Sequence, residues 1–62
     1  MTFTHGDLVE INDDEGRTYE GTVIVPHVRI EGLDMIGIQS TLGLPARLVV
    51  EARLASVIAS NA

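Results

Sequence analysis

The 62-residue sequence predicts an all-β fold, a small barrel of about five short antiparallel strands in a single domain spanning residues 1–62. Two observations support this prediction. Six glycines and two prolines are spread along the chain and leave no long uninterrupted segment before Pro45. Between these breakers, β-branched residues recur with a period of two, which is typical of strands with one buried face.

The first strand is expected at residues 7–12. Here Val9 and Ile11 alternate with the polar residues Glu10 and Asn12. This alternation is the pattern of a half-buried strand, with Val9 and Ile11 on the core face.

A turn is expected at residues 12–18, because Asn and Asp side chains hydrogen-bond to nearby backbone and Gly16 can adopt a positive φ. The acidic run at residues 13–15 could also hold Ca²⁺ or Mg²⁺. With Gly16 at the sixth position of an EF-hand loop, however, the first and twelfth positions are Ile11 and Thr22, which carry no carboxylate. We therefore interpret the run as a hairpin tip and predict no metal site.

The second strand is expected to be long and bent. Val23 and Val25 share a parity and are predicted to lie on one face. Pro26 cannot donate a ladder hydrogen bond and requires an edge or a bulge. Beyond it the apolar parity changes to Val28 and Ile30, as one inserted bulge residue would produce.

The remaining elements are a turn at residues 31–32, a third strand at 35–38 and an ambiguous last third. Residues 46–60 lack Gly and Pro, so helix propensity alone allows an α-helix there. The β-prone run Leu48-Val49-Val50 favours another arrangement. We expect a strand at 47–51, a single 3₁₀-like turn near 53–56 and a closing strand at 57–59.

Two stretches carry a resemblance to a known superfold. Gly6-Asp7-Leu8-Val9-Glu10-Ile11, followed by Gly16 and Glu20-Gly21-Thr22-Val23, resembles the opening of SH3-like small barrels, including the KOW and Tudor-like groups. Arg53-Leu54-Ala55-Ser56-Val57 is similar to their closing turn and strand. The resemblance implies a fold only, because the chain lacks the Lys residues and exposed aromatics of nucleic-acid-binding KOW proteins. It also lacks the aromatic cluster of methyl-lysine or proline-peptide readers.

Composition excludes several classes of function. Nine Asp and Glu against four Arg and no Lys give a net charge of -5, which disfavours binding to nucleic-acid phosphates. The absence of cysteine excludes disulfides and thiolate metal sites. The start MTFTHGDL resembles no signal peptide, and no apolar run approaches a membrane span. We expect a soluble, cytoplasmic protein without a membrane partner.

Catalysis by a single chain is not expected. No serine lies in a nucleophile elbow, and no phosphate-binding loop motif occurs. His5 and His27 are interpreted as surface histidines because their spacing to the carboxylates requires no convergence. We predict no cofactor and no small-molecule ligand, although an active site formed between subunits remains an alternative.

The small size of the chain predicts association, because a 60-residue domain buries only about 60% of its unfolded surface. We expect a non-enzymatic protein-interaction or assembly module, either a homo-oligomer or an accessory subunit of a larger complex. Our candidates for the contact surface are Met35, Ile36, Leu42 and Leu44. The two leucines, in a connection between strands, could instead cover an open barrel end.

The alternative function is a nucleic-acid role in transcription, translation, or plasmid or phage biology. It requires Arg29, Arg47 and Arg53 to form a basic stripe on neighbouring strands. The competing expectation is that these arginines pair with Glu31 and Glu51 on the surface.

Overall fold

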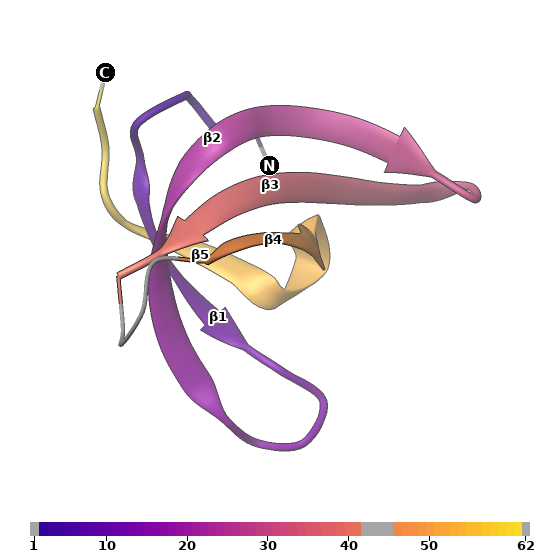
Figure 1. Cartoon of the computed structure of the whole chain (residues 1–62), viewed down its shortest axis with the longest axis horizontal. Coiled ribbons are helices and arrows are strands. Elements are labelled where there is room, and N and C mark those ends of the chain that lie inside the picture. The colour runs from indigo at the N-terminus through magenta and orange to yellow at the C-terminus, as the bar shows by residue number, and fades with distance from the viewer. Residues whose placement is uncertain (1, 42–45, 62) are drawn as a thin grey trace.

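The computed structural model describes residues 2–41 and 46–61, which form one strongly curved antiparallel sheet (Figure 1). The strand order is β4-β3-β2-β1-β5. In chain order the elements are β1 (Leu8–Asn12), β2 (Thr18–Ile30), β3 (Leu33–Ser40), β4 (Arg47–Glu51), the 3₁₀ helix η1 (Ala52–Leu54) and β5 (Ala55–Ala59). This confirms the predicted all-β fold of five antiparallel strands with a 3₁₀ turn before the last strand.

The ambiguous last third is a strand and a 3₁₀ turn rather than an α-helix. β4 has the predicted bounds, whereas η1 begins one residue earlier than expected and β5 begins at Ala55. Ala55 is buried opposite Ile11 of β1, so this pairing extends β5 toward the turn. No helix in the described part of the chain is long and apolar enough to cross a membrane.

β2 is the long, bent strand that the sequence predicts, and it is shared by two hairpins. Its first part pairs with β1 and its second part with β3 (Figure 1). The β2–β3 register shifts twice, between Val23 and Val25 and again between Val25 and Val28. The second shift brackets Pro26, as expected of a residue that cannot donate to the ladder.

The prediction that Val25 lies on the same face as Val23 is wrong. Val23 is fully buried, whereas Val25 is 43% exposed. The first register shift explains the difference, because one extra residue between the two valines moves Val25 to the opposite face of the sheet.

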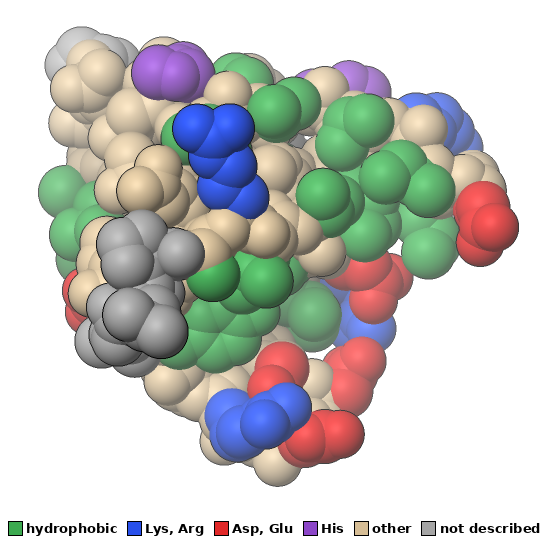
Figure 2. All heavy atoms as spheres, in the orientation of Figure 1, with side chains coloured by type: hydrophobic (Ala, Val, Ile, Leu, Met, Phe, Trp, Pro, Cys, Tyr) green, Lys and Arg blue, Asp and Glu red, His purple; other side chains and the backbone are tan. Residues whose placement is uncertain are grey.

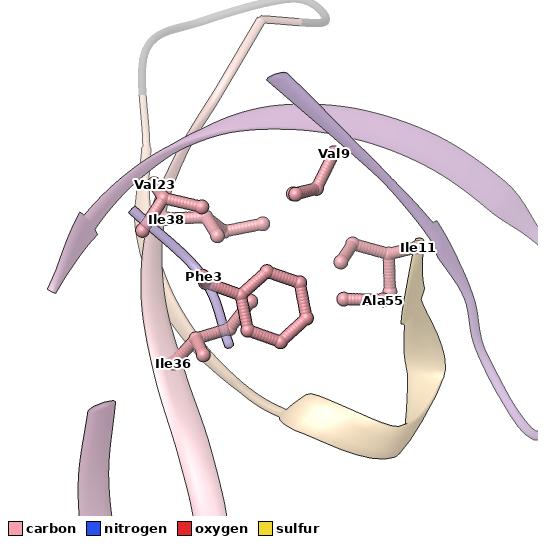
Figure 3. Close-up of a cluster of buried hydrophobic side chains, with 7 residues drawn as sticks. All are labelled: Phe3, Val9, Ile11, Val23, Ile36, Ile38 and Ala55. Carbon is pink, nitrogen blue, oxygen red and sulfur yellow. The ribbon is translucent and has the colours of Figure 1, made fainter. Parts of the chain in front are cut away.

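The core lies on the inner, concave face of the sheet, and seven buried side chains form it (Figure 3). All but one are aliphatic, in agreement with the low aromatic content. They are Phe3, Val9, Ile11, Val23, Ile36, Ile38 and Ala55. Tyr19, Val50, Ala52 and Leu54 pack around them and are partly buried.

Asp7 is a buried carboxylate that joins the two ends of the described chain. It is 2% exposed. One oxygen accepts the Thr4 N–H at 2.9 Å, and the other accepts the Asn61 N–H at 2.8 Å. The Asn61 side chain also donates to the His5 carbonyl at 3.1 Å. Because both oxygens have donors, burying this charge leaves no unsatisfied polar atom.

Candidate protein-binding surface

The outer face of β2, β3 and β4 carries an apolar patch on the side of the sheet opposite the core. Directly paired residues in antiparallel strands place their side chains on the same face. The pairs Val28↔Met35 and Ile30↔Leu33 therefore share one face of the β2–β3 hairpin. Successive residues alternate between faces, so Ile36 points from β3 into the core while Met35 points outward.

Two further pairings at Gly37 extend this face toward the edge of the sheet. Gly37 lies opposite Val25 on β2 and opposite Val49 on β4. A Cβ on Gly37 would lie 3.0 Å from the Val25 Cβ, which places the Val25 side chain over the glycine. We call the whole set the outer apolar face: Val25, Val28, Ile30, Leu33, Met35 and Val49.

The outer apolar face is exposed to solvent. Leu33 is 50% exposed and Val49 is 54% exposed. Figure 2 shows hydrophobic side chains gathered over the β2–β3 hairpin, with charged groups around their border. Scattered surface hydrophobics need no explanation, but a contiguous apolar patch with a polar border is typical of a protein interaction site.

β4 adds an open strand edge to this face. It stands at one end of the sheet order, and no other strand in the described residues pairs with its far side. Arg47, Leu48 and Val49 are all exposed. An edge of this kind presents unpaired backbone N–H and C=O groups that can pair with another chain.

The predicted contact residues are only partly brought together. Met35 lies on the outer apolar face and is half-buried. Ile36 is fully buried in the core, so its assignment to a contact surface is wrong. Leu42 and Leu44 lie outside the described residues. Of the predicted set, the structure therefore places only Met35 on the outer apolar face, beside residues that the sequence patterns do not assign to a surface.

The structure does not bring Arg29, Arg47 and Arg53 into the basic stripe that a nucleic-acid role requires. Arg29 pairs with Asp34 in the β2–β3 register and Arg47 pairs with Gln39, so five positions along β3 separate them. Figure 2 likewise shows the basic side chains dispersed and not gathered.

Two of these arginines, Arg29 and Arg53, form ion pairs with carboxylates. Arg29 donates to Asp34 at 3.1 Å, and not to Glu31 as the sequence suggested. Arg53 donates to Glu51 and Asp14, each at 3.1 Å. The hydrogen bond to Glu51, followed by that to Asp14, raises the pKa of the Arg53 guanidinium and keeps it charged.

The acidic run at residues 13–15 is a hairpin tip. One Asp13 oxygen accepts the backbone N–H groups of Glu15 and Arg17 at 2.9 and 2.8 Å, and the other accepts the Arg17 Nε at 2.9 Å. The backbone hydrogen bond from Arg17 is the main cause that lowers the pKa of Asp13. Gly16 has a φ of +82°, as expected for its place in the turn.

A hollow of about 580 Å³ lies between the β2–β3 hairpin and η1. Its apolar lining includes Phe3, Pro26 and Ala52. The His27 Nε2 lies 3.3 Å from an Asp34 carboxylate oxygen at its border. Among residues 2–41 and 46–61, no three His, Cys, Asp or Glu side chains gather into a group that could hold a metal ion.

Comparison with known proteins yields no match: no family model, no curated protein and no solved structure is similar to the chain. The functional interpretation therefore depends on the geometry of the outer apolar face and of the β4 edge.

Proposed function

We propose that the chain is a small SH3-like barrel that works as a non-enzymatic protein-interaction module, either self-associating or as an accessory subunit of a larger complex. The observation that supports this function best is the continuity of the outer apolar face with the open edge of β4. A partner on this surface could bury apolar side chains and pair with backbone groups at the same time.

The strand order and the bend of β2 support the SH3-like part of the proposal. One long strand contributes to two hairpins, and a 3₁₀ turn leads into a last strand beside β1. The inner face is filled by the core, so the outer face is the one available for contacts.

The carboxylates and arginines favour binding over catalysis. The described ion pairs are exposed and lie between groups that neutralise each other, as for Arg29 with Asp34 and Arg17 with Asp13. Exposed pairs of this kind contribute little stability and leave no convergent set of reactive groups at the outer apolar face.

The test uses the mass of the native complex, measured by light scattering on protein purified without denaturation. Val49→Ser should reduce the mass to that of a monomer, because Val49 is 54% exposed and belongs to both the outer apolar face and the open edge of β4. Ile58→Ser is the matched control, since Ile58 is 49% exposed but lies on β5 at the opposite edge. Circular dichroism must show that all variants remain folded.

Either of two results would contradict the proposal. The native protein could be a monomer with nothing bound at high concentration. Alternatively, the Val49→Ser variant could keep the full mass of the complex, which would place the contact elsewhere on the molecule.

A further inference from the structure

The edge of β4 has a charge pattern that is complementary to itself. Its sequence, Arg47-Leu48-Val49-Val50-Glu51, has a cation at one end, an anion at the other and three apolar residues between. We propose that β4 pairs antiparallel with β4 of a second copy of this chain, about a twofold axis through Val49. This inference rests on the proposed function and names the partner.

In this register every residue of β4 meets a suitable neighbour. Val49 lies opposite Val49 of the second copy, and Leu48 lies opposite Val50. Arg47 of each chain lies opposite Glu51 of the other, which gives two opposite-charge pairs across the axis. Directly opposed side chains in antiparallel strands are the closest cross-strand neighbours, so these pairings select both the direction and the register.

The side chains at the two ends are free to make these contacts. Arg47 is exposed and has no ion pair within residues 2–41 and 46–61. Glu51 accepts hydrogen bonds from Arg53 at 3.1 and 3.3 Å. A carboxylate has about four lone-pair sites, so Glu51 can accept Arg47 of the second copy without losing Arg53.

The pairing also joins the apolar patches of the two copies. Arg47, Val49 and Glu51 alternate with Leu48 and Val50, so all three lie on the outer side of the sheet. A dimer through β4 would therefore place two outer apolar faces side by side in a continuous sheet. The contact is isologous, so it closes at two copies.

The other open edge lacks this pattern. β5 has the sequence Ala-Ser-Val-Ile-Ala and carries no charge. Pairing of β4 with β5 of another copy would leave Arg47 and Glu51 without opposite partners. Such a head-to-tail contact would also leave a free edge on each chain and would continue into a ring or filament.

The test reverses the charge at one end of β4 in each of two variants and then mixes the two variants. Arg47→Glu places two anions opposite each other at both ends of the interface, and Glu51→Arg places two cations there. In sedimentation experiments each variant should weaken the dimer by about tenfold or more, given two like-charge contacts per dimer. Mixing the two variants should restore a heterodimer within about threefold of the native affinity, because each end then joins a cation to an anion.

Glu31→Arg is the charge-matched control. Glu31 lies in the turn between β2 and β3. Its replacement by Arg changes the net charge by the same amount as Glu51→Arg. It should leave the dimer affinity unchanged. If a β4 variant fails to fold, hydrogen exchange of the native chain provides a second test: the β4 amides that point away from β3 should gain protection as concentration rises, and those that point toward β3 should not.

Any of four outcomes would overturn the inference. The two single variants could dimerise as well as the native chain, their mixture could fail to recover, or the native chain could assemble beyond two copies. A native chain that stays monomeric also overturns it. In that case the proposed function stands only if a different protein binds the outer apolar face and the Val49→Ser variant releases it.

Discussion

Replacing the buried carboxylate of Asp7 should destabilise the whole domain. Asp7→Ala removes the acceptor for the Thr4 and Asn61 N–H groups, which are donated at 2.9 and 2.8 Å. Leaving a buried donor unsatisfied costs about 1–3 kcal/mol, so two donors that regain some water contact imply a total loss of about 2–4 kcal/mol. A chain of this length has a free energy of unfolding of about 3–9 kcal/mol, so a large share of it would be lost.

The assay is urea denaturation followed by far-ultraviolet circular dichroism, with the slope m compared between variants. Asp34→Ala is the matched control, because Asp34 is also a carboxylate with two partners but its side chain is 59% exposed. It should cost less than about 1 kcal/mol. An Asp7→Ala loss no larger than about 0.5 kcal/mol, the range of ordinary surface changes, would refute the role assigned to Asp7.

Three further predictions concern the turn, the core and the outer face. The pKa of Asp13 is lowered in the folded state, so its stabilising effect is present above the usual Asp value of about 3.9 and is lost as pH falls through the lowered value. Thermal melts of Asp13→Asn should therefore depend less on pH in this acidic range than those of the native chain, and an equal dependence would contradict this. Ile36→Ala should lower the urea-derived free energy of unfolding by about 2–5 kcal/mol and Met35→Ala by much less, and the reverse order would show that the two faces are misassigned. Gly37→Ala should cost about 1–3 kcal/mol by crowding Val25, and adding Val25→Ala should recover part of this loss in the same assay; no recovery would exclude that contact as the cause.

Local sequence patterns predict most of the elements correctly. β1 follows from the alternation at Val9 and Ile11, and β4 follows from a β-prone run that overrides helix propensity. The turn at residues 13–17 is predictable because Asp13 and Gly16 act on backbone within four residues. In each case the determining interactions are close in sequence.

The errors concern which face a residue occupies. The prediction that Val25 shares a face with Val23 extends the period of two through a position where the register shifts. The prediction that Ile36 and Met35 share a contact surface fails because adjacent residues of one strand point to opposite faces. Ile36 has the same parity as Ile38 in β3, and both side chains are fully buried in the core.

Other features depend on residues that are distant in sequence. Asp7 and Asn61 are separated by 54 positions, and nothing in the local sequence pattern indicates that the Asp7 carboxylate accepts the Asn61 N–H. The outer apolar face becomes visible only when the register places Val25 and Val49 on either side of Gly37. Contacts of this kind depend on which strands pair and in which register, and local sequence patterns do not reveal either.

The hydrogen bonds at Asp7 hold Thr4 and Asn61 close together, so the order of the strands along the chain can be changed by circular permutation. Because Thr4 and Asn61 bind the same carboxylate, a short peptide could connect the two ends without crossing the sheet. A new opening could then be made at Gly32, at the exposed tip of the β2–β3 hairpin (Figure 1). The resulting circular permutant is expected to keep all four strand pairings, because none of them requires an intact turn between β2 and β3.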